Sequence, residues 1–152
     1  MKKDLLIIAV LLATIVSSCQ KDDFCVDPIT PELVIRLYDN DIPEEYKSVS
    51  SLYVWAEGKD TLPDYEGVST DSIIVPLDPA NDFTIYNLSS DDVVDQITVN
   101  YTRTEIFVSR SCGYKFNYEN ISLSDISNNW IIRTEITQEN VTDETEHIKI
   151  LH

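Results

Sequence analysis

The chain has 152 residues and a formal net charge of −16, from 27 acidic and 11 basic side chains. This charge repels the phosphate backbone, so we do not expect a nucleic-acid partner, and it argues against direct adsorption to an anionic membrane surface. The length suits a single folded domain, and an apolar fraction of 43% is ordinary for a globular protein.

Residues 1–18 have the layout of a secretory signal peptide. Lys2 and Lys3 precede an apolar run from Leu5 to Val16, and two serines follow. The run is about 12 residues long, whereas a helix needs roughly 20 apolar residues to span a bilayer. A buried core helix is one rival interpretation, but the run is apolar on every side and has no amphipathic continuation. A signal peptide that releases an ordinary secreted protein is the other.

Cys19 follows the two serines that end this apolar run. The segment Val16-Ser17-Ser18-Cys19 resembles the bacterial lipobox, although Val16 stands where that motif favours leucine. The resemblance implies that Cys19 is lipidated and becomes the first residue of the mature protein, with the membrane as its partner. Each buried CH2 of an acyl chain contributes about 0.8 kcal/mol, so several chains form a firm anchor. Residues 19–30 would then be the lipidated N-terminus and a tether.

The next four residues are Gln20, Lys21, Asp22 and Asp23. In this order they resemble the short acidic export signal of surface lipoproteins of the Bacteroidota. The resemblance implies an outer-membrane lipoprotein on the cell surface, with the periplasmic face of the membrane as the alternative location. A solvated acidic linker is the alternative interpretation of the four residues themselves.

Residues 31–152 are predicted to form one all-β domain. Short alternating runs rich in β-branched and aromatic residues are separated by Asp, Asn, Ser and Pro, which is typical of antiparallel strands. The spacing of the runs favours an immunoglobulin-like or fibronectin-like β-sandwich. The expected strands are Leu33–Tyr38, Leu52–Ala56, Ser72–Leu77, Phe83–Leu88, Gln96–Thr102, Glu105–Arg110, Tyr114–Tyr118, Trp130–Ile136 and His147–Leu151.

Two segments of this domain carry further expectations. The strand Leu52–Ala56 has Tyr53 and Trp55 on one face and aliphatic residues on the other, so both of its faces are apolar. We therefore interpret it as a central strand buried in the core rather than as an aromatic platform for a sugar or a peptide. The polar segment 138–146 is expected to be the loosest loop.

Cys25 and Cys112 remain once Cys19 is assigned to lipid. An exported protein meets an oxidising compartment, where an even number of cysteines favours a disulfide. We therefore predict one intramolecular bond between Cys25 and Cys112. Two buried free thiols are the alternative.

No catalytic residue is predicted. Nucleophilic catalysis needs a base beside the nucleophile, and the two histidines, His147 and His152, both stand near the C-terminal end. A pair of Cys112 with His147 is conceivable, but the disulfide would consume the thiol. The many carboxylates are interpreted as solvated surface acids.

No cofactor and no metal site are expected. The acidic groups at 39–45 and 91–95 offer the oxygen ligands that calcium prefers, but they lack the glycine and the spacing of an EF-hand loop. We interpret both groups as acidic turns. Separately, Asp60-Thr61-Leu62 and Asp71-Ser72-Ile73 resemble the three-residue acceptor of O-glycosylation in the Bacteroidota, which makes Thr61 and Ser72 candidate modification sites.

Three segments together resemble a Bacteroidota lipoprotein family of unknown function. They are Thr30–Asp39, Val54–Asp60 and Phe107–Tyr114, and Cys25 and Cys112 fit the two non-lipid cysteines of that family. The resemblance implies no activity. We expect a non-catalytic binding or accessory module at the outer membrane, with an outer-membrane protein or a glycan as partner. A structural or adhesive subunit of a surface assembly is the alternative, and an enzyme is not expected.

Overall fold

The structure is a computed structural model that describes Cys25 and residues 30–152. The predicted signal peptide, the candidate lipidation site Cys19 and the candidate export signal Gln20–Asp23 lie outside the described residues. Within the part of the chain that the structure describes, no helix is long and apolar enough to cross a membrane.

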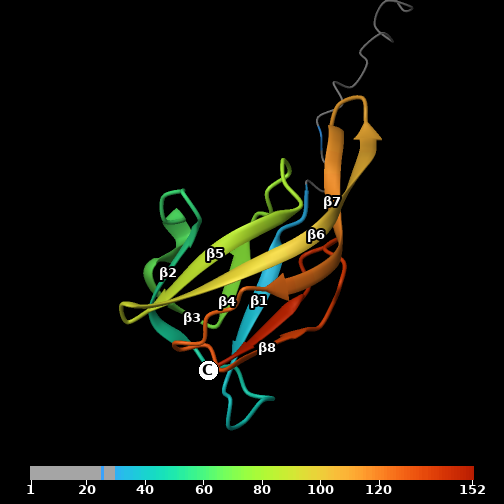
Figure 1. The fold of residues 1–152 in the computed structure, drawn as a ribbon. Helices are drawn as coiled ribbons and strands as arrows, with labels where there is room; N and C mark the ends of the chain where they lie inside the picture. Colours follow the sequence, from blue (N-terminus) through green and yellow to red (C-terminus); the bar gives the residue numbers. More distant parts are fainter. Residues whose placement is uncertain (1–24, 26–29) are drawn as a thin grey trace, which may run out of the picture.

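The described domain contains nine strands and one short 3-10 helix, η1 (Figure 1). Their bounds are β1 Leu33–Tyr38, β2 Val49–Ala56, η1 Pro63–Tyr65, β3 Glu66–Thr70, β4 Ser72–Val75, β5 Phe83–Ser90, β6 Val93–Ser109, β7 Gly113–Ser124, β8 Arg133–Ile136 and β9 Ile148–Leu151.

The strands form two sheets, a four-stranded one of order β4-β1-β9-β8 and a five-stranded one of order β3-β2-β5-β6-β7. All neighbouring strands are antiparallel except β1 and β9, which pair in parallel with Ile35 opposite Ile148. Side chains on the inner faces of both sheets belong to a single hydrophobic cluster, to which β1 contributes Leu33, Ile35 and Leu37. The prediction of an all-β, sandwich-like fold is therefore confirmed.

The predicted strand boundaries differ from the structure in the five-stranded sheet. The segments 96–102 and 105–110, predicted as two strands, belong to the single 17-residue strand β6. A register shift against β7 between Asn100 and Thr102 interrupts the alternation without turning the chain. Strand β3 was missed because it lies at a sheet edge and has no fully buried residue, so it lacks an apolar run.

The interpretation of Leu52–Ala56 as a strand buried on both faces is wrong. Leu52 and Val54 are fully buried, but Tyr53 on the opposite face is 41% exposed. Strand β2 lies inside its sheet, between β3 and β5, but only one face of that sheet meets the core. The face that carries Tyr53 is turned to solvent.

The expectation that 138–146 is the loosest loop is also wrong for its first half. The backbone of Val141 exchanges two hydrogen bonds with Tyr118 of β7, at 2.7 and 3.2 Å, and Glu139 accepts a third from Ile121. Val141 is fully buried in the core. This segment therefore covers part of the outer edge of β7.

His147 leads into β9 and is fully buried. Its ring Nδ1 accepts a hydrogen bond from the backbone N–H of Val34 at 3.1 Å. The backbone N–H of His147 donates to the Val34 carbonyl at 3.0 Å. The proton of the neutral ring is therefore on Nε2, which has no hydrogen-bond partner within the described chain. Burial lowers the pKa of His147, so the ring stays neutral and fastens the last strand to the first.

The carboxylate of Asp95 in β6 is fully buried. Its two oxygens accept four hydrogen bonds at 2.7 to 2.8 Å, from the Ser127 hydroxyl and from the N–H groups of Asn129, Trp130 and Ile131. These donors lie in the connection from β7 to β8, which crosses between the sheets. Asp95 thus replaces the ladder partners that this irregular segment lacks.

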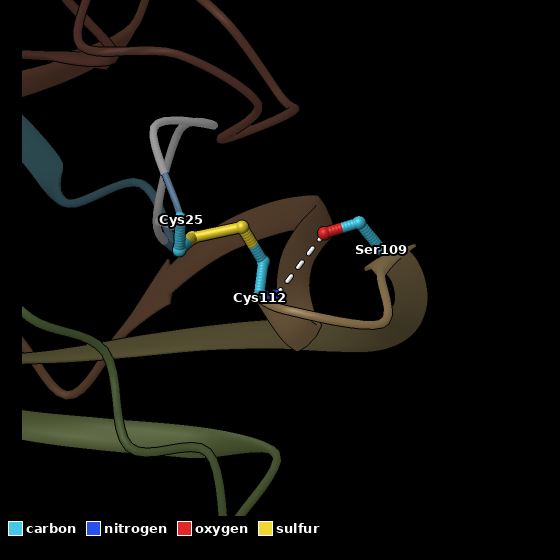
Figure 2. Close-up of a disulfide and its surroundings, with 3 residues drawn as sticks. All are labelled: Cys25, Ser109 and Cys112. Atoms are coloured by element: carbon cyan, nitrogen blue, oxygen red, sulfur yellow. Dashed lines mark hydrogen bonds between the residues drawn. A yellow bond between two sulfur atoms is a disulfide. The ribbon is translucent and has the colours of Figure 1, made fainter. Parts of the chain in front are cut away.

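Strands β6 and β7 form a long hairpin that extends beyond the rest of the domain (Figure 1). Ser109 pairs with Gly113 across the turn, and Gly113 has a φ of +74°, a backbone conformation that favours glycine. At this turn Cys112 is bonded to Cys25, with the two Cα atoms 4.9 Å apart (Figure 2). The predicted disulfide is confirmed, and it ties the start of the domain to the tip of the hairpin.

Candidate functional site

A groove of about 460 Å³ opens between two connections, the one from β2 to η1 and the one from β4 to β5. We call it the crossover groove, because the β4–β5 connection carries the chain from one sheet to the other. Apolar side chains supply most of its lining: Ala56, Leu62, Pro76, Pro79, Phe83 and Ile85. Polar groups are contributed by Glu57, Lys59, Asp78 and Asn81.

Three tyrosines hold one wall of the crossover groove in place. They come from three neighbouring strands of the five-stranded sheet, and their hydroxyls donate to three successive carbonyls of the β4–β5 connection. Tyr86 bonds the carbonyl of Pro76, Tyr118 that of Leu77 at 3.0 Å, and Tyr101 that of Asp78 at 2.9 Å. Because all three side chains are buried, this wall is fixed by the core.

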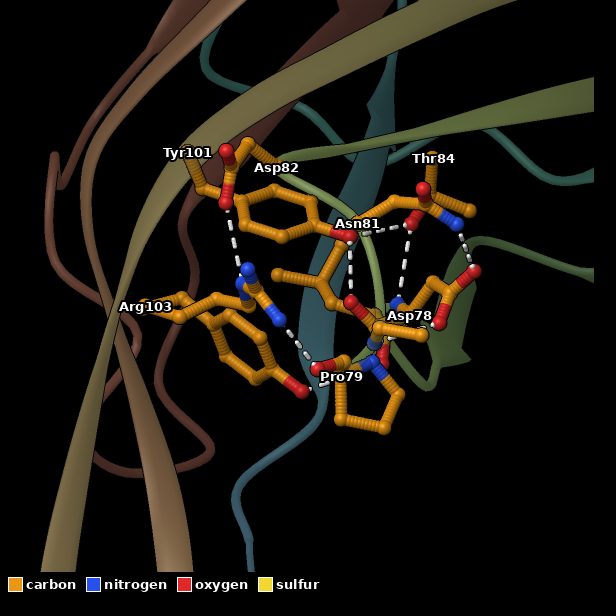
Figure 3. A network of polar contacts seen from close by, with 10 residues as sticks. Asp78, Pro79, Asn81, Asp82, Thr84, Tyr101 and Arg103 are labelled. Carbon is orange, nitrogen blue, oxygen red and sulfur yellow. Dashed lines mark hydrogen bonds and ion pairs between the residues drawn. The ribbon is translucent and has the colours of Figure 1, made fainter.

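Polar side chains of this connection, together with Thr84 of β5, add further hydrogen bonds (Figure 3). The Asp78 carboxylate accepts from the Ala80 N–H and from the Asn81 amide, each at 2.8 Å. Thr84 accepts the N–H of Asp78 at 3.0 Å and shares a hydrogen bond of 2.7 Å with the Tyr101 hydroxyl. Together these bonds make the segment a rigid turn rather than a mobile loop.

Arg103 of β6 contacts two residues of the β4–β5 connection (Figure 3). Its Nε pairs with the Asp82 carboxylate at 2.9 Å, and its terminal nitrogen donates to the Pro79 carbonyl. The pair is largely exposed, so it contributes little to stability by itself. Its effect is to keep the turn close to β6.

The ionisation states around the crossover groove are settled by burial and hydrogen bonding. Burial raises the pKa of Tyr118 to about 12 and also raises the pKa values of Tyr86 and Tyr101, so all three phenols remain donors at neutral pH. The N–H of Ala80, helped by the Asn81 amide, lowers the pKa of Asp78, which stays ionised. These groups are engaged in the hydrogen bonds that hold the β4–β5 connection in place.

A second, shallower depression of about 440 Å³ lies on the solvent-facing side of β2. Tyr53, Trp55 and Thr61 contribute to its lining. A Cβ atom at Gly67 would lie 2.8 Å from the Tyr53 hydroxyl, so the ring packs directly over this glycine of the edge strand β3. Tyr53 therefore covers a bare stretch of backbone as well as facing the depression.

The remaining sequence-predicted sites are separated in the structure. Ser72 lies at the start of the edge strand β4, and Thr61 lines the depression on the solvent-facing side of β2. Asp39 accepts the N–H of Asp41 and pairs with Lys47, as expected of an acidic turn. Among the described residues, no group of three or more metal-ligating side chains comes together.

The three tyrosines that shape the crossover groove carry no motif in the sequence, and none of them was a predicted site residue. The phenols of Tyr86, Tyr101 and Tyr118 bond carbonyls 10, 23 and 41 residues away. The available signal was weak: Tyr101 and Tyr118 stand between polar neighbours on predicted strands, which places them on the core face, whereas Tyr86 stands between Ile85 and Asn87 and lacks that pattern. A buried phenol there needs an acceptor, but its partner is a matter of topology.

The fold and the groove together define a small two-sheet β domain with a preformed, mostly apolar depression at a crossover between its sheets. The chain belongs to a family of unknown function, DUF6452, which matches residues 51–152. The matched segment starts inside β2 and contains Cys112, the whole groove lining and the three tyrosines, whereas β1 and Cys25 precede it. Neither a curated protein nor a solved structure matches the chain.

Proposed function

We propose that this protein is a lipid-anchored lipoprotein of the outer membrane whose β domain is a non-catalytic binding or accessory module on the cell surface. The observation that carries the binding role is the crossover groove, whose wall is fixed by three buried tyrosines before any ligand arrives. A preformed site loses little conformational freedom when it binds. Its volume of about 460 Å³ is within the range of about 300 to 1,000 Å³ usual for ligand pockets.

The lining of the groove favours an apolar side chain of an extended segment, supplied by an outer-membrane protein. Phe83 is 47% exposed at the groove and offers a contact surface that is not yet covered. A glycan is the alternative partner. In that case the depression beside Tyr53 and Trp55 is the surface on which a sugar ring would stack.

A structural subunit that accepts a donor strand from a neighbour would need an open sheet edge. The Tyr65 hydroxyl bonds both the N–H and the carbonyl of Ile74 in the edge strand β4, at 2.6 and 3.3 Å. The edge strand β8 has only four residues and carries Arg133 and Glu135. Both edges of the four-stranded sheet are thus capped by a side chain or short and charged, which favours the binding module over the structural subunit.

The lipid anchor is tested by metabolic labelling with an acyl-chain analogue. Wild-type protein is expected to carry the label and to sediment with membranes, whereas Cys19→Ala is expected to lose both properties, because Cys19 is the cysteine at the end of the lipobox-like segment. Cys25→Ala serves as the matched control and should remain labelled. Equal labelling of wild type and Cys19→Ala would contradict the anchor.

Surface exposure is tested by adding protease to intact cells. The domain is expected to be removed from wild-type cells, and alanine substitutions at Lys21, Asp22 and Asp23 are expected to protect it by retaining it in the periplasm. A periplasmic marker must stay intact in the same samples. Resistance of wild-type protein that becomes cleavable after lysis would place the domain on the periplasmic face.

The binding role of the groove is tested by cross-linking in intact cells and mass spectrometry. Phe83→Asp is expected to reduce recovery of the partner by on the order of tenfold, because 1.4 kcal/mol of lost binding energy suffices for that factor. Ile42→Asp is the control, since Ile42 is 51% exposed and lies outside the groove lining. An equal loss of partner recovery in both variants, or no loss in either, would show that the groove is not part of the binding surface.

A further inference from the structure

The inner face of the β6–β7 hairpin changes from buried to exposed along its length. In each strand of the hairpin, every second residue from the core residue Tyr101 or Tyr118 toward the turn lies on the same face as that core residue. Tyr118 is fully buried and Phe116 is packed against the core, but Tyr114 is 63% exposed. Phe107 lies directly opposite Tyr114 and is 56% exposed.

Phe107 and Tyr114 form an edge-to-face pair, with their ring centroids 5.3 Å apart. The hairpin extends beyond the other strands at this point (Figure 1). The two rings are therefore exposed on the same face that packs against the core at Tyr118. A compact domain of this size normally covers such a pair. The pair therefore provides an apolar surface for a partner outside the domain.

The charge of the hairpin tip is opposite to that of the protein. Between Glu105 and Glu119 the sequence contains Arg110 and Lys115 but no carboxylate, in a chain whose net charge is −16. Arg110 lies in the turn, and Lys115 follows Tyr114 directly. Exposed aromatic rings next to basic side chains match the chemistry of a bilayer interface, where aromatic rings lie at headgroup level and cations meet anionic headgroups.

The covalent structure also brings this tip toward the membrane. Cys112 at the turn is bonded to Cys25, which is only six residues after the proposed lipidated residue Cys19 (Figure 2). Six residues can reach at most about 22 Å even when fully extended. Tyr114, two residues after Cys112, is therefore held near the headgroups whenever Cys19 is anchored.

We infer that the tip of the β6–β7 hairpin is a second membrane contact, in which Phe107 and Tyr114 enter the interface of a bilayer with anionic headgroups and Arg110 and Lys115 meet its phosphates. This inference rests on the proposed lipid anchor. The anchor supplies proximity, and the tip sets the orientation of the domain. The four-residue β8 edge and the loop that carries Ile42 lie away from this contact (Figure 1).

The test uses the full lipidated protein in vesicles of phosphatidylethanolamine and phosphatidylglycerol whose acyl chains carry bromine. Tyr114→Trp and Ile42→Trp each add one fluorophore at an exposed position, and wild type supplies the background from Trp55 and Trp130. Bromine is expected to quench the added fluorescence of Tyr114→Trp several-fold more than that of Ile42→Trp. Charge reversal of Arg110 and Lys115 in the Tyr114→Trp protein is expected to reduce this quenching.

The outcomes separate the inference from the proposed function. Equal quenching at both positions in protein that floats with the vesicles would overturn the membrane contact and leave the anchor standing. Failure of wild-type protein to float would overturn the anchor, and the inference with it. Protection of Tyr114→Trp from aqueous acrylamide in native envelopes, together with no quenching by brominated lipid in the vesicles, would assign the tip to a protein partner and overturn the inference.

Discussion

Replacement of Asp95 by alanine is expected to lower the free energy of unfolding by about 3 to 5 kcal/mol, because each buried donor left without an acceptor costs about 1 to 3 kcal/mol. Asp95 accepts one hydroxyl and three backbone N–H groups, and no side chain of alanine can replace these bonds. The measurement is denaturant unfolding followed by tryptophan fluorescence. Trp130 lies within the affected segment and should report the change directly.

Two further variants identify the cause of this effect. Asp41→Ala removes an exposed carboxylate and should change the free energy of unfolding by a few tenths of a kcal/mol at most. Asp95→Asn keeps the shape but places an amide NH2 among donors, so an intermediate loss is expected. If Asp95→Ala unfolds like Asp41→Ala, the carboxylate does not hold the β7–β8 connection.

Asp95 should also affect how the free energy of unfolding depends on pH under acidic conditions. Burial alone would raise its pKa, but the hydrogen bonds from Ile131, Asn129, Trp130 and Ser127 outweigh burial and lower it. Since the pKa is lower in the folded state, this stabilisation is complete above the ordinary aspartate pKa of about 3.9 and is lost as the pH falls through the folded-state value. In Asp95→Asn this part of the acid dependence should be missing.

Replacement of Cys112 by serine is expected to lower the free energy of unfolding by about 2 to 5 kcal/mol. The bond closes a loop with a sequence separation of 87 residues, and the chain-entropy model assigns roughly 4 to 5 kcal/mol to a loop of this length. Cys25→Ser should give the same loss, since either change opens the same loop. Ser111→Ala, beside Cys112 in the turn, is the matched control and should behave like wild type.

The disulfide prediction has a local readout as well as a global one. Phe116 donates its N–H to the Thr30 hydroxyl at 3.1 Å, so the start of the domain lies along β7 near the bond. In Cys112→Ser the amide of Phe116 should exchange with solvent faster, whereas the protein should remain in the membrane fraction. Two free thiols in protein isolated from the envelope, measured by mass spectrometry, would contradict the bond.

The sequence was informative where the signal is local. Alternation of apolar and polar residues is a property of a few neighbouring residues, and it placed β1, β5 and β9 close to their observed positions. It was less informative at the edge strand β3 and at the register shift of β6, where the local pattern is weak or interrupted. The disulfide was predictable from a count of cysteines and an expected compartment, with no geometry at all.

By itself, the amino-acid sequence determined the all-β class, most strand positions and the identity of the bonded cysteine pair, because each of these depends on local periodicity or on residue counts. Only the tertiary structure decided which face of β2 meets solvent, which carbonyls Tyr86, Tyr101 and Tyr118 hold, and which donors Asp95 accepts. Those contacts join residues between 10 and 41 positions apart, and they depend on which strands become neighbours. Pairing of strands is set by the burial of the whole core, so no local pattern contains it.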